Sequence, residues 1–172
     1  MSAAFRVPFN DTLKFDGKKL TRFDDDGNVV AEYPALSGRP SKVINKGGKK
    51  YKTKDYTTSE NQGEIGLGPI PEGNYVALQA DFQEISTKDK VLGFIGRGAW
   101  PGGTYSWGES RVWLTPAPGN DALFRGGFSI HGGTVFGSAG CVDLCTSMSR
   151  FSQDFKDYGK DILLRVDYSE QK

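Results

Sequence analysis

Apolar and polar residues alternate over many short stretches of this chain, and turns rich in glycine, aspartate and asparagine separate these stretches. Alternation with a period of two is typical of half-buried β-strands, which Asp-Gly and Gly-Asn turns commonly join. The pattern therefore predicts short strands, the first three of which form a β-meander. The expected strands cover residues 12–15, 19–23, 29–33, 75–78, 91–95, 111–114, 128–131 and 161–168.

A helical period replaces the strand period near the C-terminal end of the sequence. Thr146 or Ser147 can cap the first turn of this helix, and Gly159 can stop the last one. The apolar positions that recur every three or four residues are Met148, Phe151, Phe155 and Tyr158. The expected fold class is therefore mainly β with one substantial helix.

Residues 37–68 interrupt the strand pattern with a polar segment rich in glycine and lysine. Its clustered cations are Lys46, Lys49, Lys50, Lys52 and Lys54. Two interpretations are open: a solvated surface loop, or a flap over a site or a contact to an anionic surface. Because no internal repeat and no second domain are recognisable, we expect one domain over residues 1–172 with this segment as an insertion.

Composition and charge exclude several classes of protein. The 172 residues include 22 Lys and Arg against 21 Asp and Glu, and the formal net charge of +1 gives no electrostatic basis for nucleic-acid binding. A hydrophobic content of 37% argues against a disordered chain, and 23 glycines argue against a helical bundle. The sequence contains no run of eighteen apolar residues that would span a membrane.

His131 and Cys141 are the residues best suited to chemistry in this chain. His131, the sole histidine, ends an apolar strand, and Cys141 follows ten residues later after a loop with four glycines that allow a tight return. A thiol with an unperturbed pKa of about 8.5 is mostly protonated at neutral pH, and a neighbouring imidazole can take its proton. Successive backbone N–H groups in residues 138–141 can stabilise an oxyanion.

Other interpretations of these residues stay open at this point. A lone cysteine is often a small buried hydrophobe, and a lone histidine is often a hydrogen-bonded structural residue. The spacing of His131, Cys141 and Cys145 fits none of the usual zinc patterns, so we expect no metal and no cofactor. We expect Cys145 in the core without a disulfide to Cys141, because four extended residues span about 13 Å and a disulfide allows about 7 Å between Cα atoms.

Two segments of the sequence resemble the signature of the L,D-transpeptidases, cysteine enzymes of the bacterial cell wall. They are the His-Gly pair at 131–132 and the segment SAGCVD at 138–143. The turn PEGNY at 71–75, the Trp-Gly pair at 107–108 and the order of helix and strand over 146–168 resemble the same family. The resemblance covers residues 66–168 and implies an L,D-transpeptidase-like β-sandwich or open barrel.

The resemblance also implies a role for each residue of the motif. Cys141 would be the nucleophile, and His131 would be its base and later the acid. The carbonyl of Gly132 would orient the imidazole, and Ser138 would organise the turn. The backbone N–H groups of Gly140 and Cys141 would form the oxyanion hole.

The implied substrate is the tetrapeptide stem of peptidoglycan. The enzyme would attack the carbonyl between the L-centre and D-Ala, and the acyl group would pass to water or to an amine. This gives L,D-carboxypeptidase activity, exchange of D-amino acids or cross-linking. Trp107, Asp143 and Arg111 would contact the substrate, with Arg125 and Arg39 as further candidate ligands of its carboxylate, because they lie near the motif segments.

The first residues and the turn before residue 75 suggest where such an enzyme would act. Residues 1–8 contain no apolar core of the kind that a secretory signal requires, so we expect synthesis in the cytoplasm without a signal peptide. The segment GPIPEGNY at 68–75 resembles a compact subgroup found among type VI secretion effectors. That subgroup implies delivery into the periplasm of rival bacteria, with a secretion-system carrier and an immunity protein as partners.

Two rival functions remain. Another cysteine hydrolase of the cell wall, such as an amidase or endopeptidase, would use the same pair, although those families usually place the cysteine before the histidine. A β-rich module that binds wall glycans would instead use the lysine-rich segment and stack sugars on aromatic platforms. Its aromatic candidates are Trp100, Trp107 and Trp113.

Overall fold

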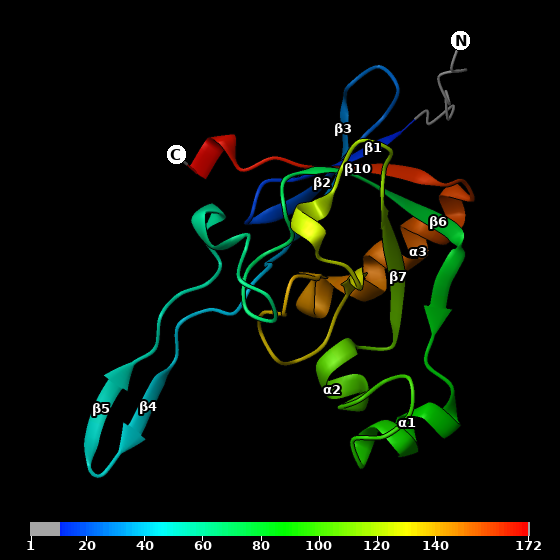
Figure 1. Ribbon diagram of the computed structural model, residues 1–172. Coiled ribbons are helices and arrows are strands. Elements are labelled where there is room, and N and C mark those ends of the chain that lie inside the picture. The colour runs from blue at the N-terminus through cyan, green and yellow to red at the C-terminus, as the bar shows by residue number, and fades with distance from the viewer. Residues whose placement is uncertain (1–10, 172) are drawn as a thin grey trace.

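A computed structural model describes residues 11–171 of the chain and shows one eight-stranded, curved sheet (Figure 1). The strand order is β3-β2-β1-β10-β6-β7-β8-β9. The strands are β1 (Thr12–Phe15), β2 (Lys19–Phe23), β3 (Val29–Pro34), β6 (Gly73–Glu84), β7 (Ser110–Pro116), β8 (Phe128–His131), β9 (Val142–Asp143) and β10 (Ile162–Val166). Residues 1–8, on which the expectation about a signal peptide rests, lie outside the described residues.

The N-terminal meander joins the C-terminal strand through a parallel pairing. Strands β1, β2 and β3 pair in antiparallel order, as the Asp-Gly turns predict, whereas β1 pairs with β10 in parallel from Thr12↔Leu163 to Phe15↔Val166. Alternate residues of β1, Leu13 and Phe15, are fully buried in the core. The mainly β fold class with an open, curved sheet is therefore confirmed.

The predicted helix is α3 (Met148–Tyr158), which packs against the sheet and supplies much of the core. Its buried ring of Phe151 meets Tyr33 of β3 edge-on at 5.4 Å, and Gly159 ends the helix with a φ of 66°. Neither Thr146 nor Ser147 makes a side-chain cap, because a 3₁₀ turn (Cys145–Ser147) leads directly into the helix. Within residues 11–171, no helix has both the length and the apolar character needed to cross a membrane.

The prediction of a strand over residues 91–95 is wrong. This segment belongs to α1 (Thr87–Phe94), whose first turn is capped by the Ser86 hydroxyl accepting a hydrogen bond from the N–H of Asp89 at 3.1 Å. A short apolar run does not distinguish a strand from a helix, and here the local cap decides. The glycine-rich segment 96–108 likewise contains a short helix, α2 (Gly103–Trp107).

The polar insertion at 37–68 contains a hairpin rather than only a loop. Strands β4 (Val43–Lys46) and β5 (Lys49–Lys52) pair with each other and with no strand of the large sheet. Gly47 and Gly48 between them have φ angles of 60° and 77°, which the tight turn of a hairpin requires. The hairpin projects away from the rest of the molecule (Figure 1).

Candidate active site

The site lies where β8 ends, between the first residues of β7 and the short strand β9. His131 is the last residue of β8 and pairs with Arg111 of β7 on one side and with Asp143 of β9 on the other. The parallel pairing of β9 with β8 returns the chain after the loop 132–140, so that Cys141 comes back beside His131. Both side chains line one cavity of about 380 Å³. The structure therefore brings together the two residues that the sequence singled out.

The imidazole of His131 is held in one orientation. Its Nδ1 lies 2.7 Å from the carbonyl oxygen of Gly132, and since a carbonyl can only accept, Nδ1 carries the proton. Nε2 is then left to interact with the thiol. His131 is only 4% exposed, so its orientation is also fixed by packing, including the ring of Trp107 at 5.1 Å.

The pKa values of His131 and Cys141 shift in opposite directions. Burial alone would lower the pKa of His131, but the hydrogen bond to Cys141, the charge of Cys141 and the Gly132 carbonyl together raise it above its ordinary value. Burial alone would raise the pKa of Cys141, but the hydrogen bond to His131 and its charge lower it below the ordinary value of a thiol. These shifts favour a thiolate–imidazolium pair, the reactive form of a nucleophilic cysteine.

Ser129 is a site residue that the sequence interpretation missed. It lies two positions before His131 on β8, so both side chains point to the same face of the sheet. Its hydroxyl donates to Sγ of Cys141 at 3.4 Å, and this contact also lowers the pKa of the thiol. In the sequence, the alternation along β8 places Ser129 and His131 on the same face of the strand. This would have indicated Ser129 only if it had been known that Cys141 packs against that face.

The turn before Cys141 is shaped by Ser138 and Gly140. The Ser138 hydroxyl donates to the carbonyl of Cys141 at 2.5 Å and so bridges the turn. Gly140 has a φ of 117°, and a Cβ at this position would lie 2.6 Å from a nitrogen of Arg125. Outside the strand ladders, neither the N–H of Gly140 nor that of Cys141 donates to a backbone carbonyl of residues 11–171.

Arg125 ties this turn to the rest of the fold rather than lining the cavity. Its guanidinium donates to the carbonyls of Pro69 at 2.6 Å, Gly68 at 3.0 Å and Ala139 at 3.3 Å. It also binds the carbonyl of Gln62. With its donors used in this way, Arg125 supports the loop and is not placed as a ligand of a substrate carboxylate.

Asp143 does not occupy the position expected of a substrate ligand. It is fully buried, and its two carboxylate oxygens accept hydrogen bonds from the N–H of Gly137 at 3.0 Å and of Cys145 at 2.8 Å. Asp143 lies two residues after Cys141, in β9, where the backbone pairing turns its side chain inward. Asp143 therefore links the loop between His131 and Cys141, at Gly137, to the 3₁₀ turn that begins at Cys145.

Arg111 is likewise buried behind the site instead of facing the cavity. It is 4% exposed and donates to Oε1 of Gln83 and to the carbonyl of Ala99, both at 3.0 Å. Three indole rings surround its guanidinium, those of Trp100 at 3.9 Å, Trp113 at 4.4 Å and Trp107 at 4.9 Å. Burial lowers the pKa of Arg111, and attraction to the charge of Cys141 opposes that shift.

The cavity wall combines Trp107 with residues from the polar insertion. Trp107 is half-buried, and its Nε1 donates to the carbonyl of Pro101 at 2.9 Å, which fixes the indole at the cavity. Exposed Arg39 and Lys42 and half-buried Pro40 form another part of the wall. Of the arginines considered from the sequence, Arg39 is the one that faces the cavity.

Cys145 differs sharply from Cys141. It is a free thiol and only partly buried, so it lies beside the core rather than in it. Burial together with the charge of Asp143 raises its pKa to about 12, which makes this thiol unreactive at neutral pH. Within residues 11–171, the one group of side chains close enough to share a metal is Asp24, Asp25 and Asp26, in the β2–β3 turn and not in the cavity.

Comparisons with known proteins show that this chain resembles solved structures in its fold. The sequence matches no protein-family model and no curated protein. The structure of Bd1075 from Bdellovibrio bacteriovorus is 18% identical with a TM-score of 0.52, and the alignment covers 93% of this chain and 48% of that chain. The crystal structure of an L,D-transpeptidase from Xylanimonas cellulosilytica is 15% identical with a TM-score of 0.49, and the alignment covers 97% of this chain and 65% of that chain. This chain thus spans about half the length of Bd1075.

Proposed function

We propose that this protein is a cysteine-dependent enzyme that modifies the tetrapeptide stem of peptidoglycan. The observation that carries the proposal is the Cys141–His131 pair in a cavity, with the imidazole oriented by Gly132 and the pKa of the thiol lowered. The motif around Cys141 supports the same class of reaction. The products would be those of an L,D-carboxypeptidase or of L,D-transpeptidase exchange.

The proposed reaction uses these groups one after the other. The Cys141 thiolate attacks the carbonyl carbon of the bond to D-Ala, and the N–H groups of Gly140 and Cys141 stabilise the oxyanion. His131 gives its Nε2 proton to the leaving amine as the C–N bond breaks, which leaves a thioester on Cys141. His131 then takes a proton from water or from an incoming D-amino acid, whose attack releases the product and restores the thiolate.

Muropeptide mass spectrometry tests this proposal. The purified protein, kept reduced, is incubated with disaccharide tetrapeptides, with and without a free D-amino acid. We expect tripeptide products without the amino acid and exchanged tetrapeptides with it. Cys141→Ala should abolish both products, whereas Cys145→Ala, the matched control, should retain them. Unchanged muropeptides with the wild type would refute the proposal.

The same experiment separates the proposal from its rivals. An amidase or endopeptidase would cut elsewhere in the stem or the cross-link, and the product masses would show this. The glycan-binding alternative loses support from the tryptophans, because Trp100 is 3% exposed and all three rings enclose Arg111 instead of forming an open platform. A binding module would also keep its biological effect in Cys141→Ala.

We further propose that the enzyme acts as an antibacterial effector in the periplasm of a target cell, with a secretion-system carrier and an immunity protein as partners. The test is expression in a Gram-negative host with and without an added periplasmic signal. Growth should fall only with the signal and only when Cys141 is intact. Equal toxicity in the cytoplasm, or toxicity of Cys141→Ala, would contradict this role.

A further inference from the structure

The β4–β5 hairpin has no structural role that the described residues reveal. Every residue of both strands is exposed, and neither strand pairs outside the hairpin. An isolated two-stranded hairpin is marginally stable in water and adds little to a folded core. Its exposed apolar side chains, Val43, Ile44 and Tyr51, are therefore available for a partner.

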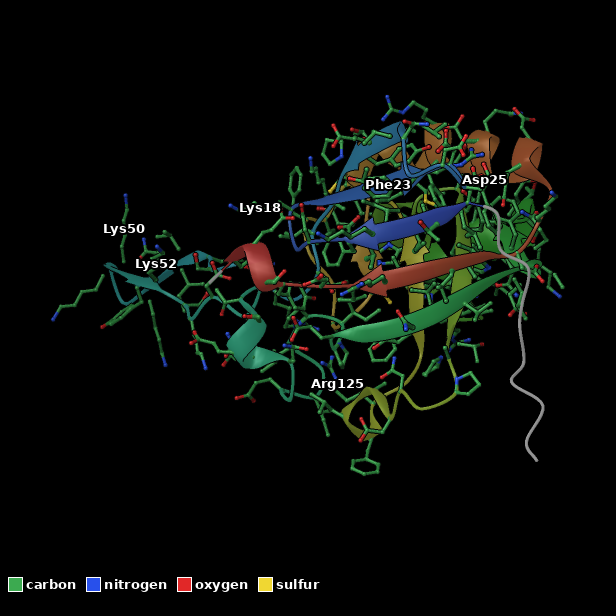
Figure 2. All side chains as sticks on the ribbon, turned by 90° about the horizontal axis from the view of Figure 1, so that it is seen from above. Lys18, Phe23, Asp25, Lys50, Lys52 and Arg125 are labelled. Atoms are coloured by element: carbon green, nitrogen blue, oxygen red, sulfur yellow. The ribbon has the colours of Figure 1, made fainter. Side chains whose placement is uncertain are left out.

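The hairpin concentrates the positive charge of the molecule. The segment 42–54 contains six lysines and no acidic residue, so the rest of the chain carries a formal net charge of −5. No carboxylate of the described residues forms an ion pair with any of the six. Figure 2 shows Lys50 and Lys52 extending from the hairpin into solvent. An uncompensated basic surface of this kind attracts anions.

This surface is continuous with the cavity that holds Cys141. Arg39 and Lys42, which line the cavity, precede β4 directly in the chain. The cross-strand pairs Asn45↔Lys50 and Lys46↔Lys49 carry lysines onto both faces of the hairpin beyond them. A basic strip, defined here as residues 39–54, therefore leads from the cavity to the tip of the hairpin.

We propose that this basic strip binds the anionic polymer from which the stem peptide projects, through the free carboxylates of neighbouring stems. The inference rests on the proposed function. The strip extends past the cavity of about 380 Å³ that Arg39 and Lys42 line, and weak contacts from separate lysines accumulate only on a ligand with repeated charges. Protein interfaces are depleted in lysine and rely on aromatic and arginine anchors, so six lysines with one tyrosine favour a polyanion over a protein partner.

A pelleting assay with insoluble peptidoglycan sacculi tests the strip. All proteins carry Cys141→Ala, so that binding is measured without turnover. The test variant is Lys46→Glu/Lys50→Glu/Lys52→Glu, and the control is Lys18→Glu/Lys88→Glu/Arg97→Glu, which makes the same charge change at exposed positions elsewhere. We expect the Kd for sacculi to rise at least tenfold in the test variant and less than twofold in the control. Amidation of the sacculus carboxyl groups or added salt should weaken binding of the parent protein.

The outcomes of this assay test binding by the basic strip separately from the proposed enzymatic function. Equal pelleting of the test variant and its parent, absence of pelleting by the parent, or full binding to amidated sacculi would overturn it; an acidic protein would then be the partner to seek. With Cys141 restored, the test variant should process soluble tetrapeptides at the wild-type rate. Loss of that activity would place the hairpin in the catalytic site and refute a separate polymer surface. A wild type that pellets but forms no product would instead refute the proposed function.

Discussion

The edge of the sheet that carries Cys141 and the β4–β5 hairpin differ in almost every physical respect. At the sheet edge, His131, Cys141 and Asp143 are buried, and each has a defined polar partner. In the hairpin, all strand residues are exposed and the lysines have no carboxylate partner among the described residues. Burial strengthens each single polar interaction at the sheet edge. In the hairpin, each exposed charge contributes little by itself, and only the sum of many charges has an effect.

The comparison implies that single substitutions act differently in the two regions. At the sheet edge, one side chain sets the protonation or position of its neighbour, so one substitution should change the chemistry. In the hairpin, only the summed charge matters, so several substitutions are needed and the chemistry should persist. The following expectations test this contrast.

The largest effect is expected from His131→Gln. Without the imidazole, the Cys141 thiol loses the hydrogen bond and the charge that lower its pKa, and the leaving amine loses its proton donor. We expect kcat/KM for tetrapeptide muropeptides to fall at least about a thousandfold. Thermal unfolding should show that the variant is folded, and alkylation of Cys141 by iodoacetamide at neutral pH should slow. Retained activity would rule out His131 as the base.

The pH dependence of activity should follow the opposite pKa shifts of His131 and Cys141. Activity should rise with pH through the lowered pKa of Cys141, below the ordinary thiol value of about 8.5, and fall through the raised pKa of His131, above the ordinary imidazole value of about 6.5. Because His131 is the sole histidine, its NMR titration follows one residue. In Cys141→Ala its pKa should drop, since burial remains while the thiolate is lost. An unchanged pKa would contradict the coupling.

The next effect is expected from Asp143→Ala. This change leaves the partly buried N–H groups of Gly137 and Cys145 without their acceptor. We expect the free energy of unfolding to fall by about 2–4 kcal/mol, measured by urea denaturation. Asp143→Asn retains one acceptor oxygen, so the free energy of unfolding should fall by less than in Asp143→Ala. A large rise in KM with unchanged stability would instead return Asp143 to the role of substrate ligand.

A smaller effect is expected from Arg111→Met, which keeps much of the packing within the three tryptophans while removing the cation. Loss of its attraction to the Cys141 thiolate should raise the pKa of the thiol and lower kcat/KM at neutral pH by about tenfold. The alkylation profile of Cys141 against pH is the measurement, because a purely structural role would not move it. Arg111→Lys should recover part of the loss.

The smallest effect is expected from replacing residues 43–52 with Gly-Gly. Lys42 and Thr53 already lie together, since the N–H of Thr53 donates to the carbonyl of Lys42 at 2.8 Å, so the short linker can join them. The free energy of unfolding should change by less than about 0.5 kcal/mol, and kcat/KM for soluble muropeptides by less than twofold. A substantial loss of stability would show that the hairpin supports the fold.

Local pattern predicted the elements whose structure depends on nearby residues. The bounds of β1, β2 and β8 agree with the expected strands, and α3 with the expected helix, because each has a clear period and its own turn or stop residues. The strand expected at 91–95 became α1 because the Ser86 cap, outside the apolar run, decided the conformation. The hairpin at 43–52 was missed because its strands bury nothing and so show no alternation.

His131 and Cys141 as candidate reactive residues, and the glycine loop that allows them to meet, could be predicted from the sequence, because both depend on residue chemistry and on a short stretch of chain. The sequence pattern did not indicate that Asp143 turns inward, that Arg111 lies among three tryptophans or that Ser129 faces Cys141. These contacts join segments that are distant in sequence, and no local period records which strand will become the neighbour of another. The basic strip reaches the cavity through a contact of the same kind, since the N–H of Ser138 donates to the carbonyl of Gly38 at 3.1 Å.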